Sequence, residues 1–163
     1  MSDAASFAIG TFGILLDADG RVLLCHRRDI DLWNLPGGGV RPGEAPWEGV
    51  VREVAEETGL EVAVERLAGI YVKAEAGEIV FAFVCRVVSG ALTPTDEADR
   101  LEYFPPERLP PNMSRKQAER IADAVRDEGR VVLKEQRGPS SREPAGQLAG
   151  SHQDRSAKVG PGA

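Results

Sequence analysis

The sequence predicts an α/β protein in which a mixed β-sheet is covered by helices. Runs of apolar, β-branched and aromatic residues lie before and after one helical segment, and a second amphipathic helix follows them. The chain has 163 residues, of which 42% are hydrophobic and 28% are charged. These values are typical of one soluble globular domain with its own core.

The first two strands are expected at residues 7–16 and 21–27, where apolar residues dominate. Asp17-Ala18-Asp19-Gly20 separates them, and the Asp-Gly pair favours a β-hairpin. We therefore expect these two strands to pair with each other.

Three glycines, Gly37–Gly39, come next. Three glycines in a row are more often a tight turn than a phosphate-binding loop, so we expect a turn. A helix should then run from Pro46 to Thr58, because proline suits the first helical turn and Gly59 suits the left-handed residue after the last one. Ala45 is a weak residue for the expected N-cap.

The second half of the sequence predicts two long strands, a short strand and a helix. Residues 61–72 and 78–88 are strand-like and 101–104 could be a short strand. The helix should begin at Ser114, which forms a capping-box pair with Gln117. Residues 138–163 lack apolar periodicity and are rich in Gly, Pro, Ser and Ala, so we divide the chain into a domain at 1–137 and a disordered tail at 138–163.

Composition excludes several classes of function. The net charge of −6 disfavours nucleic-acid binding, which needs basic residues against the phosphates. No run approaches the roughly 20 apolar residues that cross a bilayer, and the N-terminus has no signal-peptide pattern, so we expect no membrane association. Cys25 and Cys85 are expected to be buried free thiols, and the compartment is expected to be the cytoplasm.

The segment 38–60, GGVRPGEAPWEGVVREVAEETGL, carries the strongest functional signal. Glu53, Glu56 and Glu57 are spaced i, i+3 and i+4, so a helix places their carboxylates on one face, where they repel one another. Clustered oxygen ligands are what Mg²⁺ or Mn²⁺ selects. The segment therefore predicts a metal site.

The same segment resembles the complete signature of the Nudix (MutT-like) hydrolases. Nine constrained positions are filled over 23 residues, which is a specific match. The resemblance implies an α/β/α sandwich with a loop–helix–loop at residues 38–60. It also implies a hydrolase that cleaves a diphosphate bond by attack of water at phosphorus.

The resemblance further implies roles for individual residues. Glu53, Glu56 and Glu57 would ligate Mg²⁺, or Mn²⁺ in its place, with a backbone carbonyl of Gly37 or Gly38. Glu53 could instead act as the general base, and Arg52 would orient the carboxylates, in part through Glu44. A later acid often helps to bind metal in this family.

Two acids are candidates for that later ligand. Glu102 is the preferred one, and Glu97 stands behind it. Glutamates at such positions are more often solvated charges than metal ligands.

The substrate is expected to be a small nucleoside diphosphate linked to another group. Arg27 and Arg28 could meet a terminal phosphate and Trp33 could stack on a base, although such residues in strands more often belong to the structure. Oxidised nucleotides, nucleotide sugars and dinucleoside polyphosphates all remain open, as does a homodimer. A Nudix-fold sensor that binds a nucleotide without hydrolysis is the alternative function, but it would more often lack some of these carboxylates.

Overall fold

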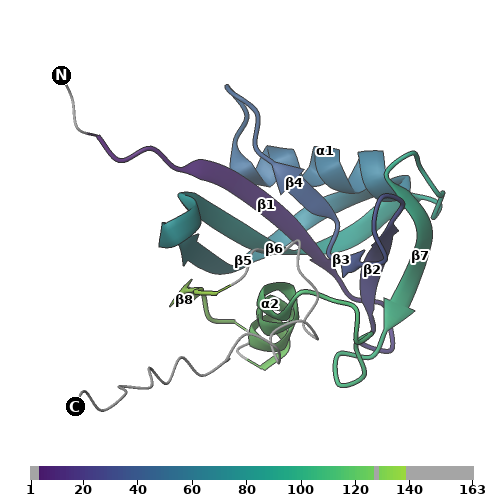
Figure 1. Cartoon of the computed structure of the whole chain (residues 1–163). Coiled ribbons are helices and arrows are strands. Elements are labelled where there is room, and N and C mark those ends of the chain that lie inside the picture. Colours follow the sequence, from purple (N-terminus) through teal and green to yellow (C-terminus); the bar gives the residue numbers. More distant parts are fainter. Residues whose placement is uncertain (1–3, 127–128, 139–163) are drawn as a thin grey trace, which may run out of the picture.

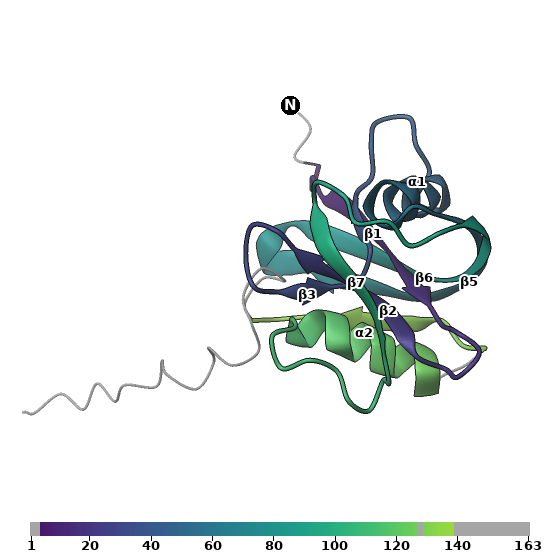
Figure 2. The same cartoon turned by 90° about the vertical axis from the view of Figure 1, so that its right-hand side faces the viewer.

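The protein is an α/β/α sandwich in the computed structural model, which describes residues 4–126 and 129–138 (Figure 1). Helix α1 (Pro46–Thr58) covers one side of the strands, and helix α2 (Arg115–Arg126) covers the other. Figure 2, turned by 90°, shows the same order of layers. The predicted α/β fold is confirmed.

Two sheets lie between the helices within the described residues. The larger is mixed, with the order β4-β1-β6-β5-β8, in which β1 with β6 and β5 with β8 run parallel. The smaller is antiparallel, with the order β3-β2-β7. The strands are β1 (Ala8–Leu15), β2 (Val22–Arg27), β3 (Trp33–Asn34), β4 (Gly37–Gly39), β5 (Leu60–Lys73), β6 (Glu78–Gly90), β7 (Ala98–Phe104) and β8 (Val132–Glu135).

The predicted hairpin between the first two strands is formed only at its turn, and the expected pairing along the two strands is wrong. Strand β1 pairs with β6 along its whole length, and β2 pairs with β7 in the other sheet. An isolated bridge between Leu16 and Val22 joins the strands β1 and β2. The Asp17 carboxylate accepts hydrogen bonds from the backbone N–H groups of Asp19 and Arg21, so the turn does reverse the chain. The two strands then diverge because each finds a longer partner elsewhere.

The glycine segment is a strand, not the expected turn. Strand β4 pairs antiparallel with β1, with Gly37 opposite Phe12 and Gly38 opposite Thr11. A Cβ atom at Gly37 would lie 2.2 Å from the Thr11 carbonyl oxygen, and one at Gly38 would lie 2.7 Å from Glu53 Oε1. The glycines are therefore needed for close approach, since any side chain would push β4 away from β1 and α1.

Helix α1 has the predicted bounds and the predicted caps. Ala45 is the N-cap and offers no side-chain oxygen, but its N–H donates to Glu48 Oε2 at 3.0 Å. Gly59 ends the helix with φ 78°, the left-handed conformation that glycine adopts without strain. Val50 and Val54 are fully buried on the side of the helix that faces the sheets. This packing fixes which side chains point toward the glycine strand.

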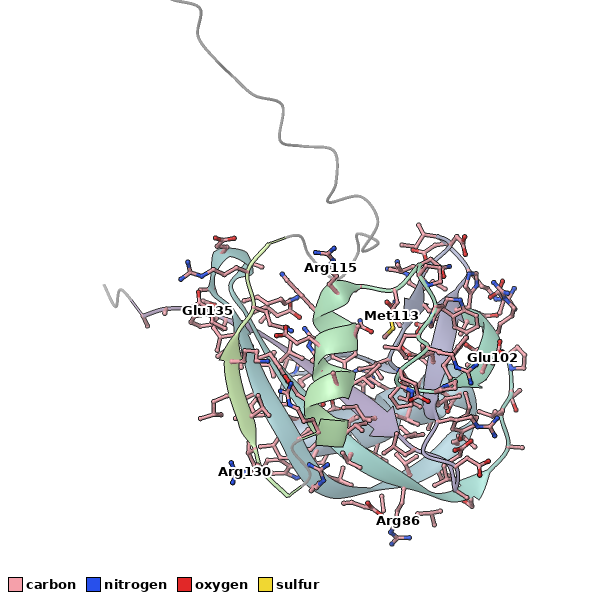
Figure 3. The ribbon with its side chains drawn as sticks, turned by 90° about the horizontal axis from the view of Figure 1, so that it is seen from below. Arg86, Glu102, Met113, Arg115, Arg130 and Glu135 are labelled. Atoms are coloured by element: carbon pink, nitrogen blue, oxygen red, sulfur yellow. The ribbon has the colours of Figure 1, made fainter. Side chains whose placement is uncertain are left out.

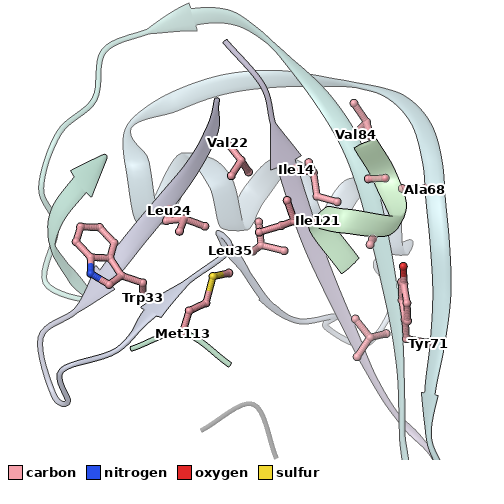
Figure 4. Close-up of a cluster of buried hydrophobic side chains, with 13 residues drawn as sticks. Ile14, Val22, Leu24, Trp33, Leu35, Ala68, Tyr71, Val84, Met113 and Ile121 are labelled. Atoms are coloured by element: carbon pink, nitrogen blue, oxygen red, sulfur yellow. The ribbon is translucent and has the colours of Figure 1, made fainter. Parts of the chain in front are cut away.

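The core consists of two clusters, one on each side of the strands. The cluster under α1 contains Val50, Val54, Leu15, Leu23 and Phe83. The cluster under α2 includes the labelled residues Ile14, Val22, Leu24, Tyr71 and Ile121 (Figure 4). Figure 3 shows α2 from its own side, with β8 beside it. Alternate residues of β1 and β2 thus enter different clusters, as the two-residue period of a strand requires.

The C-terminal part departs from the predictions in three places. Helix α2 begins at Arg115, so Ser114 takes the expected N-cap position and its carbonyl accepts the Ala118 N–H, but Gln117 does not serve as a cap: its Oε1 accepts a hydrogen bond from the Leu35 N–H at 2.6 Å. Strand β7 begins at Ala98 and is longer than the predicted 101–104, and β8 was not predicted.

Three further expectations concern the cysteines, the membrane and the tail. Cys25 and Cys85 are buried and free, as predicted. Among the helices of the described residues, none has the length and apolar character needed to cross a bilayer. The predicted tail at 138–163 lies, beyond Gly138, outside the described residues.

Candidate active site

Three carboxylates converge beside the glycine strand. Glu53, Glu57 and Glu97 each offer an oxygen, and these oxygens all lie within 4.8 Å of one another. Glu53 and Glu57 are one turn apart on α1, so they share a face of the helix. Glu97 comes from the segment just before β7 and is held there because its carbonyl oxygen accepts a hydrogen bond from the Arg28 N–H.

Glu56, predicted as a third ligand from the same helix, lies at the edge of this group. Its side chain is 44% exposed, and its oxygens accept hydrogen bonds from Arg52 Nη1 at 3.2 Å and Arg41 Nη2 at 3.4 Å. It is not among the described carboxylates that lie within 4.8 Å of one another. The structure therefore brings two of the three predicted glutamates together with Glu97, and Glu56 lies beside them at the edge of the group.

Arg52 links the loop, the helix and the glycine strand. Its Nε and Nη2 donate to the two oxygens of Glu44 at 2.6 and 2.9 Å, and its Nη1 donates to Glu53 Oε1 at 3.0 Å. Its Nη2 also donates to the Gly39 carbonyl oxygen at 3.1 Å. The expected ion pair with Glu44 is present and bidentate, a geometry that fixes the planar guanidinium. Arg52 thereby fixes the direction of the Glu53 carboxylate.

The protonation of these acids follows from their surroundings. Burial, with a smaller contribution from the charges of Glu53 and Glu97, raises the pKa of Glu57 to about 8, although the hydrogen bond from the Gly37 N–H opposes this. Burial also raises the pKa of Glu53, although Arg52 opposes this. Glu44 is the opposite case, because the hydrogen bond from Arg52 lowers its pKa to about 2. Arg52 therefore compensates the negative charge of Glu44, whereas the negative charges of Glu53 and Glu57 are not fully compensated.

The three converging carboxylates fit a divalent cation. Among the described residues, no lysine or arginine forms an ion pair with Glu57 or Glu97, and the raised pKa of Glu57 shows that the negative charge of this carboxylate is poorly compensated. Carboxylate oxygens at this separation are the donors that Mg²⁺ and Mn²⁺ prefer. Gly37 and Gly38 line the same space, and the absent side chain of Gly38 leaves room next to Glu53.

A cavity of about 500 Å³ opens beside these carboxylates. It lies between the two sheets, because β1 and β4 provide one wall while β2 and β3 provide the other. Its volume is in the range that small-molecule sites occupy. The lining residues are Phe12, Cys25, Arg27, Arg28, Asp29, Asn34, Leu35, Gly37, Gly38, Glu57, Asp96, Glu97, Ala98 and Gln117.

Glu102 lies away from the carboxylate group. It is exposed on β7 opposite Leu24, while its neighbours Leu101 and Tyr103 pack into the cluster under α1 (Figure 3). Because side chains alternate along a strand, Glu102 points away from α1. The preference for Glu102 over Glu97 is therefore corrected. The missed signal was the apolar pair that flanks Glu102.

Arg27 and Arg28 line the cavity, whereas Trp33 does not. Arg27 pairs with Asp29 at the rim, and Arg28 Nε donates to the Thr95 carbonyl oxygen at 2.7 Å. Trp33 is 5% exposed, and its ring meets those of His26 and Phe104 at centroid distances of 5.0 and 4.9 Å. Figure 4 shows it in the core beside Met113, so the structure gives no support to stacking of Trp33 on a base.

A buried histidine of β2, His26, joins strand β7 to the loop that follows β2. His26 Nδ1 lies 2.7 Å from Asp99 Oδ1, and His26 Nε2 lies 2.8 Å from Asp31 Oδ1. Asn112 Nδ2 donates to the same Asp31 oxygen at 2.8 Å. These contacts join β2, the loop that follows it, β7 and the residues that precede α2.

Comparison with known proteins agrees with this geometry. The family model of the NUDIX domain matches residues 7–127. A MutT-like protein of Streptomyces ambofaciens is 33% identical over 118 residues, which are 72% of this chain and 77% of the relative. A Bacillus subtilis relative, provisionally named an 8-oxo-dGTP diphosphatase, is 37% identical over 102 residues, covering 62% of this chain and 68% of its own.

A solved structure gives the same result. The crystal structure of an ADP-ribose pyrophosphatase from Streptococcus suis superimposes with a TM-score of 0.66 at 27% identity. The match covers 77% of this chain and 98% of that one. It therefore includes nearly the whole of that protein.

Proposed function

The chain belongs to the Nudix family of hydrolases that act on diphosphate bonds, and we propose that it is a metal-dependent pyrophosphohydrolase of nucleoside diphosphate derivatives. The observation that carries this proposal is the convergence of Glu53, Glu57 and Glu97 at the mouth of a cavity of nucleotide size.

Glu53, Glu57 and Glu97 would hold Mg²⁺, or Mn²⁺ in its place, with the backbone of Gly38 beside them. A bound divalent cation neutralises phosphate charge and lowers the pKa of water. Glu56 is more exposed than Glu53 and Glu57. Its carboxylate accepts hydrogen bonds from Arg52 and Arg41 and so holds these two cationic side chains at the edge of the site.

Within this site the protein itself positions a proton acceptor. We assign that role to Glu53, because the hydrogen bond from Arg52 Nη1 fixes one of its oxygens. Arg52 acts as a positioning residue, since Glu44 occupies two of its donors. Arg27 and Arg28 at the opposite rim would meet the phosphates or the group beyond them.

The names of the relatives support a nucleotide as part of the substrate. The Bacillus subtilis protein is provisionally named for 8-oxo-dGTP, and the Streptococcus suis structure is titled for ADP-ribose. Both molecules contain a phosphoanhydride bond in a phosphate chain that is attached to a nucleoside. We therefore propose a nucleotide of this kind as the substrate of this chain, without choosing between the two molecules.

A nucleotide panel tests the proposal. Purified protein is assayed with nucleoside triphosphates, ADP-ribose, nucleotide sugars and dinucleoside polyphosphates, and the products are separated by ion-exchange chromatography. We expect a nucleoside monophosphate as product with Mg²⁺ or Mn²⁺ and none with excess chelator. A nucleotide that binds with metal at alkaline pH, but is never hydrolysed, would favour the alternative of a sensor.

A further inference from the structure

Residues 91–97 connect β6 to β7 and lie against the C-terminal end of α1 (Figure 1). The last four carbonyl oxygens of a helix have no partners within it, so other groups must donate to them. The Thr93 N–H donates to the Thr58 carbonyl oxygen at 2.9 Å, and the Thr95 hydroxyl donates to the Glu57 carbonyl oxygen at 3.5 Å. The connection therefore supplies part of the C-terminal cap of α1.

The Thr95 hydroxyl uses all of its hydrogen-bonding capacity. Besides donating to Glu57, its oxygen accepts hydrogen bonds from the N–H groups of Glu97 at 3.3 Å and Ala98 at 3.2 Å. A threonine hydroxyl has one donor and two acceptor positions, and all three are occupied here. One side chain thereby links the backbone of Glu57 to that of Glu97, two residues whose carboxylates converge from different elements.

The backbone of Thr95 is also held in place. Its N–H donates to the Ala98 carbonyl oxygen at 2.8 Å, and its own carbonyl oxygen accepts a hydrogen bond from Arg28 Nε at 2.7 Å. The Arg28 N–H donates to the Glu97 carbonyl oxygen at 3.2 Å. Because the Glu97 side chain is exposed, the position of its carboxylate depends on the backbone that carries it.

We propose that the Thr95 hydroxyl is a positioning group that assembles the carboxylate site before a cation binds. It holds Glu97 beside Glu57, although the negative charges of these two carboxylates repel each other. A site whose ligands are already in place loses less conformational entropy on binding, so it binds a divalent cation more tightly. The inference deepens the proposed function, on which it rests, and adds a residue that does not line the cavity.

Three substitutions separate the hydroxyl from the rest of the side chain. Thr95→Val keeps the shape of the side chain but removes its donor and both acceptor positions, whereas Thr95→Ser keeps the hydroxyl. Thr93→Val is the matched control, because it removes a hydroxyl from the same connection whose hydrogen bond, to the Ala91 carbonyl oxygen, stays within that connection. Thr95 is only half-buried and Thr93 is exposed, so we expect all three variants to fold.

Two measurements without nucleotide test the proposal. Isothermal titration with Mn²⁺ should give a Kd about tenfold higher for Thr95→Val, as is typical when groups that orient metal ligands are lost, while Thr95→Ser and Thr93→Val should stay within about twofold of wild type. Amide hydrogen exchange of the metal-free protein, followed by NMR, should be faster at Glu97 and Ala98 in Thr95→Val by about tenfold or more and unchanged in Thr93→Val.

Two results would overturn the inference. One is a Thr95→Val protein with the Mn²⁺ affinity or the amide exchange of wild type. The other is an equal loss of affinity in Thr95→Ser, since the effect would then not follow the hydroxyl. Neither measurement depends on turnover. If wild type hydrolyses no nucleotide of the panel but Thr95→Val still weakens Mn²⁺ binding, the proposed function fails while the inference stands.

Discussion

Replacing Glu57 by glutamine should stabilise the metal-free protein at alkaline pH. The pKa of Glu57 is raised from 4.5 to about 8, mainly by burial, so the folded protein keeps a proton that the unfolded chain loses. Stability is therefore greatest below pH 4.5 as far as this group is concerned, and it falls as the pH rises toward 8. Glutamine has no such titration.

The magnitude follows from that pKa. Since one pKa unit corresponds to about 1.4 kcal/mol, ionising Glu57 in the folded state costs at most about 5 kcal/mol. The side chain is only half-buried, and water reduces the cost, so we expect Glu57→Gln to gain about 1 to 3 kcal/mol at pH 9. That corresponds to roughly 3 to 10 °C in melting temperature for a domain of this size.

The measurement is urea unfolding at pH 6 and pH 9 in excess chelator. Wild type should lose stability between these pH values, and Glu57→Gln should lose much less. Glu102→Gln is the matched control, because Glu102 is exposed and far from the carboxylate group, and it should behave as wild type. A Glu57→Gln protein that is less stable than wild type at pH 9 would refute the reasoning.

Three further outcomes are expected. Glu97→Gln should lower kcat at least tenfold with saturating Mg²⁺ because it removes one of the three converging carboxylates, while Glu102→Gln should stay within twofold in the same kinetic assay. Arg52→Lys should lower kcat about a hundredfold but leave KM nearly unchanged, since lysine cannot bridge Glu44 and Glu53; an equal rise in KM would contradict a positioning role. Deleting residues 139–163 should change neither melting temperature nor kcat, because their sequence has no apolar pattern with which to pack. A fall of several degrees would contradict the proposed domain boundary.

Local signals in the sequence were enough to predict helix α1 and the two strands β5 and β6. Proline at the start, Gly59 directly after the end and the spacing of Val50 and Val54 determine the helix from residues 46–59 alone. The strands β5 and β6 follow each other with a short connection, so their pairing is also local. Arg52 and Glu44 are eight residues apart, and their ion pair could be predicted for the same reason.

The remaining features depend on pairing between distant segments. The Asp17–Gly20 turn gives no information about β6, which pairs with β1 along its whole length although Ala8 and its partner Glu78 are 70 residues apart. Gly37–Gly39 have no side chains from which to predict a strand, and their role depends on the closeness of Thr11 and Glu53. Glu97 reaches the site because β7 pairs with β2, a contact that the sequence around Glu97 does not encode.

The division of the cavity between two sheets separates two tasks within one small protein. The residues proposed to do the chemistry come mainly from α1 and β4. Arg52 of α1 donates hydrogen bonds to Glu44 and to Gly39 of β4, and fewer than 20 residues separate it from either partner. The opposite wall belongs to β2 and β3, which are anchored to β7 through His26 and Asp99. Mutations that reshape that wall leave the ionic contacts of Arg52 intact. The side chains of β2 and β3 that face the cavity could therefore be changed to alter its shape while Arg52 keeps its contacts with Glu44, Glu53 and Gly39.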